Sequence, residues 1–208
     1  MPEAQQNRVR AGAKIDGRRA RSRRTRQELI EAYLALAREK GVVPTAGQVA
    51  RRAGCSQRSV FERFASVGQL GLAVFDHVLD HLPAPPAGIG RDGDDRRARI
   101  EFGVAARASN CEAWLPLWSL ASQSAGTSQA VESRIAKVRD VMRDRLVLMF
   151  APELAVLRQP RRGALLITLE ALMGFDCWAR LRNHYGLSIE QARSIWVEAL
   201  DQLLPAAA

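Results

Sequence analysis

Histidines, cysteines and arginines are the residues of this chain whose types and spacing could support chemistry. His77 and His81 are four residues apart, so a helix would present both imidazoles on one face, where they could bind a metal ion. Asp76 and Asp80 precede them, but no cysteine or third histidine lies nearby in the sequence. We therefore interpret this segment as an exposed helix face and predict neither a metal nor a cofactor.

Catalytic motifs are missing from the sequence. It contains no glycine-rich phosphate loop, nucleophile motif or paired-carboxylate motif, so we predict that the protein is not an enzyme. The cysteines, Cys55, Cys111 and Cys177, are far apart and odd in number, which argues against a disulfide framework and favours a reducing compartment. For Cys55, packing is the main interpretation and redox sensing the alternative.

The first residues and the longest apolar stretch predict the cellular location of the protein. The first residues are polar and rich in arginine, so we expect no signal peptide. The longest apolar stretch, 164–175, contains Glu170 and is too short to span a bilayer. We predict a cytoplasmic protein without a membrane partner, associated with the nucleoid when it is bound to DNA.

The surplus of positive over negative charge is confined to the first third of the chain. The net charge is +9; residues 1–70 contain 15 Lys or Arg and 6 Asp or Glu, whereas residues 71–208 contain 16 of each sign. Such a one-sided surplus predicts binding to a polyanion, and a solvated basic tail without a partner is the alternative. Residues 1–24 lack apolar periodicity and are predicted to form a flexible basic arm. Its cluster of arginines is Arg18, Arg19, Arg21, Arg23 and Arg24.

Helix start signals follow this arm. Thr25 and Glu28 have the spacing of a capping box, so a first helix is predicted from Thr25 to a stop at Gly41. Thr45 and Gln48 repeat the pattern and predict a short second helix.

A third helix is predicted immediately after the second. Gly54 ends the second helix, Ser56 is a typical N-cap residue, and Val60, Phe61 and Phe64 have the spacing of one helix face. Short helices joined by a tight turn that contains glycine are typical of a helix-turn-helix. Residues 25–70 are therefore predicted to form a DNA-binding domain.

The remaining residues, 71–208, are predicted to form a larger helical domain for regulation and dimerisation. No segment alternates with a period of two, so the predicted fold class is all-α. Pro116 is expected to kink its helix or to stand in its first turn. The expected segments are a helix over 67–82, a loop over 83–95, helices around 100–104 and 114–121, a long helix over 131–149, a helix over 164–184 and a final helix capped at Ser188.

The last two helices have the composition of an interface. Residues 164–184 are apolar on nearly all sides, which predicts that all sides are buried. We interpret these helices as a hairpin that pairs with its symmetry mate in a four-helix homodimer interface; packing within one monomer is the alternative. The final helix has heptad-like spacing of Ile189, Ala192, Trp196, Ala199 and Leu203.

The segment 24–79 closely resembles the DNA-binding region of TetR-family regulators, over about a quarter of the chain. The family pattern has a helix that ends in glycine, then T-x-x-x-I-A-x-x-A-G-V-S, then a short helix of the type T-[LV]-[YF]-x-[HY]-F. The residues that match are Gly41, Thr45, Val49, Ala50, Ala53, Gly54, Cys55, Ser56, Ser59, Val60, Phe61, Phe64 and Leu70.

This resemblance implies a homodimer that places two recognition helices in successive major grooves of a near-palindromic operator in double-stranded DNA. Ser56 would cap the recognition helix, and Arg58 would be the best candidate to bind a guanine. Thr25, Arg26 and Thr45 stand where family members contact phosphate. The full predicted DNA-binding set is Thr25, Arg26, Thr45, Ser56, Gln57, Arg58, Ser59, Phe61, Arg63 and the five arginines of the arm.

Two departures from the family pattern predict weaker contacts to the DNA backbone. Phe61 stands where the family often has a tyrosine that reaches phosphate, and Val67 and Gly68 replace a lysine and an acidic residue. We expect the basic arm to compensate, by following the backbone or entering a minor groove.

The resemblance also implies a small-molecule pocket in the second domain. Its neutral charge balance and apolar helices predict a small, largely apolar effector. The predicted function is a repressor that such a ligand releases from its operator; the alternative is a helix-turn-helix regulator without an effector, controlled by abundance or by a protein partner. The predicted pocket residues are Trp114, Trp118, Met142, Met149, Phe175 and Trp178.

Overall fold

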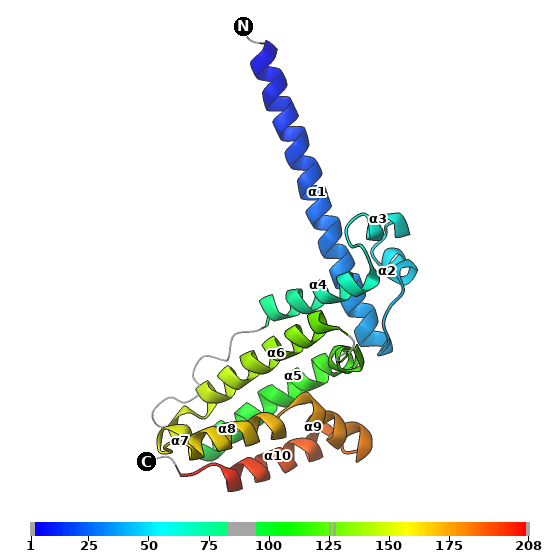
Figure 1. Cartoon of the computed structure of the whole chain (residues 1–208). Helices are drawn as coiled ribbons and strands as arrows, with labels where there is room; N and C mark the ends of the chain where they lie inside the picture. Colours follow the sequence, from blue (N-terminus) through cyan, green and yellow to red (C-terminus); the bar gives the residue numbers. More distant parts are fainter. Residues whose placement is uncertain (1–2, 83–94, 125, 127, 207–208) are drawn as a thin grey trace. The chain divides into compact units, whose positions relative to one another are not determined.

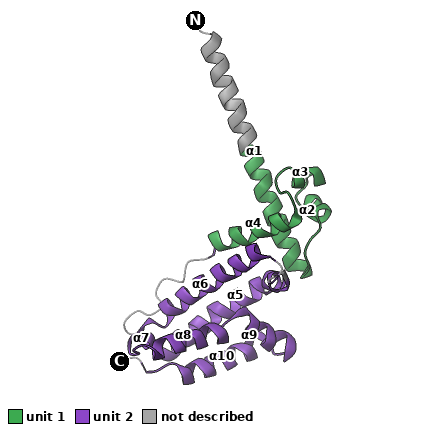
Figure 2. Ribbon diagram, viewed as in Figure 1, with its two compact units in different colours: residues 1–80 green, residues 81–208 purple. Residues whose placement is uncertain are grey.

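The computed structural model describes residues 3–82, 95–124, 126 and 128–206, with side chains from residue 20 onwards. Within these ranges every regular element is a helix and none is a strand, which confirms the predicted all-α class. The chain forms two compact units, residues 1–80 and 81–208 (Figures 1 and 2). No helix of the described part is long and apolar enough to cross a membrane.

The first unit contains α1 (Glu3–Lys40), α2 (Ala46–Arg52), α3 (Gln57–Phe61) and α4 (Val67–Asp80). α1 packs against both α2 and α4, and α2 packs against α3. The sequence-based division assigned residues 71–80 to the second domain. Because α4 packs along α1, those residues belong to the first unit instead.

α1 begins at Glu3 and not at Thr25, so residues 3–24, which were predicted to form a flexible arm, are helical instead. Thr25 therefore lies inside the helix and caps nothing. The Thr25 hydroxyl donates to the carbonyl oxygen of Arg21 at 3.1 Å, and Glu28 accepts from Nε of Arg24 at 3.0 Å instead of forming a capping box. A capping box needs the free backbone N–H groups of a helix start, and a helix that continues backwards leaves none at Thr25.

The start of α2 and the ends of α1 and α2 agree with the sequence. Thr45 and Gln48 form the predicted capping box, with the Thr45 N–H donating to Oε1 of Gln48 at 2.8 Å. Gly41 and Gly54 have φ values of 62° and 65°, which glycine adopts without strain where a helix ends.

The core of the first unit is built from aliphatic residues of all four helices. Phe64 is also buried, but Phe61 is 49% exposed, so these two aromatic side chains do not share one buried face as predicted. Phe61 follows Val60 directly, and adjacent helix positions point in different directions. The fully buried residues are Leu29, Ala37, Val49, Val60, Leu70 and Val74.

The second unit holds the remaining helices. Its helices lie alongside one another, with α5 packed against α6, α9 and α10, and α8 against α6 and α10 (Figure 1). They are α5 (Arg96–Ser124), α6 (Gln129–Met149), α7 (Ala151–Ala155), α8 (Arg161–Leu172), α9 (Phe175–Ala179), a π-helical turn η1 (Arg180–His184) and α10 (Ile189–Leu203).

Two expected boundaries in this unit are wrong. Pro116 lies inside α5, which is one continuous helix rather than two. Conversely, the helix expected over 164–184 is broken, because Gly174 adopts an extended conformation and starts α9 as its N-cap. The loop expected over 83–95 lies outside the described residues, except for Asp95. The cap at Ser188 is confirmed, as a capping box with Gln191.

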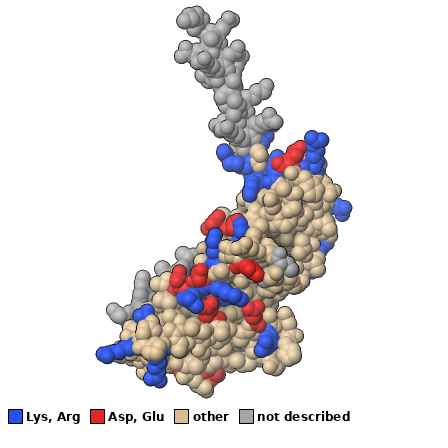
Figure 3. Space-filling view, viewed as in Figure 1, with Lys and Arg blue, Asp and Glu red and all other residues tan. Residues whose placement is uncertain are grey.

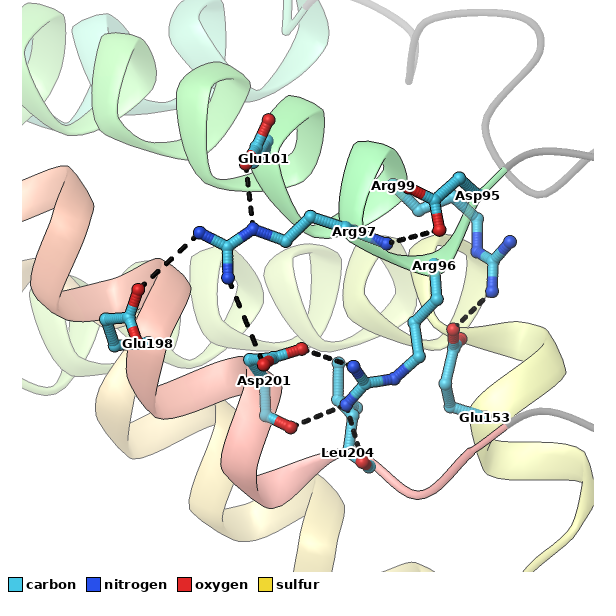
Figure 4. Close-up of polar contacts among 9 residues, drawn as sticks. All are labelled: Asp95, Arg96, Arg97, Arg99, Glu101, Glu153, Glu198, Asp201 and Leu204. Carbon is cyan, nitrogen blue, oxygen red and sulfur yellow. Dashed lines mark hydrogen bonds and ion pairs between the residues drawn. The ribbon is translucent and has the colours of Figure 1, made fainter.

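Arginines at the start of α5 form ion pairs with α7 and α10 (Figure 4). Arg96 forms an ion pair with the Asp201 carboxylate and donates to the Leu204 carbonyl at 2.8 Å, which satisfies backbone oxygens at the end of α10. Arg99 pairs with Glu153 of α7 at 2.5 Å, and both side chains are buried.

Candidate functional site

The first candidate site is the exposed surface of α3 and the residues around it. Ser56 fixes the start of α3: its side-chain oxygen accepts from the Ser59 N–H at 3.2 Å, and the two hydroxyls are 3.0 Å apart. Gln57 is exposed, and the Arg58 side chain is 88% exposed. α3 therefore presents two long polar side chains from its first turn to solvent.

Arg58 of α3 and Arg63, which follows that helix, point in different directions. Arg58 is held by its exposed neighbour Glu62 at 3.0 Å, a contact that an anion can replace at little cost. Arg63 is only 20% exposed and donates from Nη1 to the Ser59 carbonyl at 3.0 Å. Arg63, which follows α3, thus folds back along that helix, and Arg58 is the arginine presented outward.

Basic side chains on α1 add to the charge of this unit. Arg21, Arg23 and Arg24 are exposed, and the exposed Arg26 places its guanidinium 4.6 Å from the centre of the Phe64 ring. Figure 3 shows Lys and Arg gathered in the first unit next to the grey atoms, with acidic atoms beside them, and Lys and Arg mixed with acidic residues over the second unit.

The other predicted DNA-binding residues have mixed surroundings. Thr45 and Phe61 are exposed, although the Thr45 hydroxyl accepts the capping hydrogen bond of α2, and Thr25 is half-buried. Arg18 and Arg19 lie on the helical backbone of α1, but their side chains are outside the described residues.

The second candidate site is a cavity of about 590 Å³ inside the second unit. It lies between α5, α6 and α8 and extends to the residues that link α8 to α9. Its volume falls within the usual range for small-molecule sites.

Four of the six predicted pocket residues line this cavity: Trp118, Met142, Met149 and Phe175. The Trp118 and Phe175 rings are stacked, with their centres 4.9 Å apart. Trp114 and Trp178 are not part of the lining.

Trp178 has a different role from the one predicted. It is fully buried, its ring lies 4.6 Å from that of Trp196, and its Nε1 donates to Oε1 of Glu112 at 2.7 Å. These contacts make it a core residue between α5, α9 and α10.

Arginines are the cavity residues that hydrophobic spacing did not predict. Arg107, Arg139, Arg143 and Arg145 all line the cavity, which was expected to be largely apolar. A signal for Arg107 was available, because it follows Ile100 and Val104 on the buried stripe of α5, where a charged residue is unusual.

The cysteines and histidines show no arrangement for chemistry. All three cysteines are free, and burial raises the pKa of Cys111 to about 11, which keeps its thiol protonated and unreactive. Cys55 is half-buried in the turn between α2 and α3. Within the described ranges, no three His, Cys, Asp or Glu residues come together closely enough to hold a metal.

Comparison with solved structures supports the fold. No family model matches the chain, and no curated protein matches it. The structure is similar to that of a TetR transcriptional regulator from Rhodococcus sp. RHA1, with a TM-score of 0.52 and 20% sequence identity. The match covers 86% of this chain and 96% of the other.

Proposed function

We propose that this chain, which has the fold of a TetR transcriptional regulator, is a sequence-specific DNA-binding regulator that reads its operator through α3. The observation that carries the proposal is the exposure of Gln57 and Arg58 on a helix whose start is fixed by Ser56. A guanidinium can donate two parallel hydrogen bonds to the O6 and N7 atoms of a guanine in the major groove. The positive charge of residues 1–70 supplies the attraction to phosphate.

The test is selection of the purified protein on randomised duplex DNA at two salt concentrations, followed by sequencing. The expected result is enrichment of a near-palindrome whose half-sites are separated by about one helical turn. Binding that is sensitive to salt but blind to sequence would contradict the proposal, because it would leave only the charge of the first unit.

We further infer that the protein acts as a homodimer through its last two long helices, α8 and α10. Apolar side chains on α10 support this, since Ile195 and Leu203 are 44% and 41% exposed and share one helix face with the half-buried Ala199. Ile167 of α8 is 63% exposed, although it also lines the cavity. A contiguous row of exposed apolar side chains is typical of a protein interface. Repression, rather than activation, is proposed because it is usual among the TetR-family regulators that the sequence resembles.

The stripe that would face the partner differs from the predicted one. Ala192 and Trp196 are fully buried inside the unit, whereas Ile195, Ala199 and Leu203 are spaced by four residues and have exposed or half-buried side chains. Sedimentation equilibrium at micromolar concentration should give a dimer, and Ile195→Glu should dissociate it. A wild-type protein that sediments as a monomer would oppose the inference.

The cavity supports control of DNA binding by a small molecule. A ligand that binds the low-affinity arrangement better by about 1–3 kcal/mol would be enough to release the operator. The measurement is fluorescence anisotropy of labelled operator DNA during titration with candidate ligands. If ligands that fill the cavity leave DNA affinity unchanged, control by abundance or by a protein partner becomes the better explanation.

A further inference from the structure

The cavity of the second unit contains a guanidinium whose hydrogen-bond partners are all uncharged. Arg107 of α5 donates from Nε to the Met173 carbonyl at 2.7 Å, and from Nη1 to Oδ1 of Asn110 at 3.1 Å and to Sδ of Met142 at 3.0 Å. Its guanidinium also lies 4.6 Å from the centre of the Phe175 ring. Among the described residues no carboxylate lies within ion-pair distance of Arg107.

The break between α8 and α9 creates part of this arrangement. α8 ends at Leu172 and α9 starts at Phe175, so the Met173 carbonyl lies between the two helices, where Arg107 binds it. Glycine suits this position, because a Cβ there would lie only 3.1 Å from the Glu170 carbonyl oxygen, closer than an ordinary van der Waals contact. The position of Arg107 is therefore fixed by backbone and by neutral side chains.

The acidic residues in the cavity wall are already engaged. Glu170 pairs with Arg143 at 2.7 Å, and Asp176 accepts from Nε1 of Trp118 at 2.8 Å. Because four arginines and these two acids line the cavity, its wall carries a surplus of positive charge.

The surroundings of Arg107 disfavour its charged form. Burial lowers its pKa, and the Arg145 guanidinium adds to this effect by repulsion. Neutral oxygen, sulfur and a ring face stabilise a buried cation less than a carboxylate does. A negatively charged group that enters the cavity would therefore gain more here than at a surface arginine.

We propose that the effector of this cavity is an organic acid with an apolar body, whose carboxylate is bound by Arg107. Trp118, Phe175, Met142 and Met149 contact the body of the ligand, and the guanidinium donates to the carboxylate head group. This inference rests on the proposed function only for what binding causes, namely release of the operator. It replaces the largely apolar effector predicted from the sequence by an anion with an apolar body.

The test compares acids with alcohols of the same carbon skeleton. Decanoate with 1-decanol, and 4-phenylbutyrate with 4-phenylbutan-1-ol, are titrated into the full-length protein without DNA, and binding is measured by calorimetry and by intrinsic tryptophan fluorescence. At least one acid should bind roughly tenfold to a hundredfold more tightly than its alcohol, as expected for a charge-assisted hydrogen bond.

Variants then assign the preference to one side chain. Arg107→Met should abolish the difference between acid and alcohol, and Arg107→Lys should restore part of it. Arg97→Met is the matched control, because it removes one positive charge from the same helix outside the cavity lining and should leave the preference unchanged. Circular dichroism checks that each variant is folded, and the retained binding of the alcohols by Arg107→Met serves the same purpose.

Three results would overturn the proposal: no binding of either acid at millimolar concentration, equal binding of acid and alcohol by the wild type, or a preference for acid that survives in Arg107→Met.

A parallel titration of the complex with operator DNA separates this inference from the proposed function. If the acid binds through Arg107 but does not release DNA, the site is correct and the release mechanism fails. If only the alcohols release DNA, the release mechanism holds and the anionic effector is wrong.

Discussion

At the scale of single residues, the difference between Arg58 and Arg63 shows how local geometry divides roles within one short segment. Both were predicted to contact DNA, yet Arg58 is 88% exposed and Arg63 is 20% exposed. The hydrogen bond of Arg63 to the Ser59 carbonyl uses one of its donors inside the protein. The two arginines therefore should not contribute equally to recognition.

Arg58→Ala should weaken binding to the selected operator by about 1–3 kcal/mol and relax the sequence preference at one base-pair position, because it removes a hydrogen-bonding group from a base edge. Arg24→Ala is the matched control, an exposed arginine with the same kind of ion pair to a glutamate four residues ahead. It should reduce affinity uniformly across sequences and make the salt dependence shallower by about one phosphate charge. Competition assays with singly mutated operators distinguish the two; an unchanged preference in Arg58→Ala would assign base reading to another residue.

Glu153 is a residue whose contribution concerns stability rather than recognition. It is fully buried and pairs with Arg99, which is 8% exposed. Glu153→Ala removes this carboxylate from a buried guanidinium and should lower the free energy of unfolding by about 3–5 kcal/mol, measured by urea denaturation. Glu101→Ala, which breaks the exposed pair with Arg97, should have a much smaller effect. Equal effects would mean that burial of the first pair is not what matters.

At the scale of helices, the sequence predicted helix starts and ends correctly wherever residues within one turn determine them. The capping boxes at Thr45 and Ser188, and the glycine stops at Gly41 and Gly54, agree with the sequence because each involves residues within one turn. The box at Thr25 failed although its pattern is equally good, since the preceding residues continue the helix.

The cavity depends on packing that local signals do not describe. Hydrophobic spacing identified Trp118 and Phe175 as candidates, but equally identified Trp178, which packs on Trp196 instead. Which side of a buried helix faces empty space depends on how helices distant in sequence pack together. The position of Arg107 required in addition the helix break at Gly174, which a continuous apolar pattern concealed.

The two capping boxes give a prediction that separates stability from DNA binding. Thr45→Ala and Ser188→Ala each remove an N-cap side chain and should each lower the free energy of unfolding by about 1 kcal/mol. Only Thr45→Ala should also weaken operator binding, because α2 and α3 pack together in the first unit and because Thr45 is itself predicted to contact phosphate. Denaturation and anisotropy measured on both variants check this. A loss of DNA affinity in Ser188→Ala would instead indicate that the second unit controls binding through the stability of α10.

At the scale of the whole molecule, most of the net positive charge lies in one of the two units. The first unit contains 15 Lys or Arg and 8 Asp or Glu and so carries +7 of the net charge of +9, whereas the cavity and the exposed apolar residues of α8 and α10 lie in the second unit. Such a separation favours a protein that binds a polyanion with one unit and a small molecule or a second copy with the other. It also means that changes to the first residues should alter DNA binding without altering ligand binding.

Deletion of residues 2–24 tests this separation. The deletion removes Arg21, Arg23 and Arg24, which are exposed, together with the basic residues before them. Affinity for the operator should fall, and the slope of log affinity against log salt should become shallower by about 0.9 for each phosphate that the protein no longer neutralises. A second variant, with glutamine at Arg18, Arg19, Arg21, Arg23 and Arg24, keeps the chain length and should reproduce most of the effect if charge is the cause. Ligand affinity and sedimentation should match the wild type in both variants, and an unchanged affinity with an unchanged salt slope would refute a role for these residues in DNA binding.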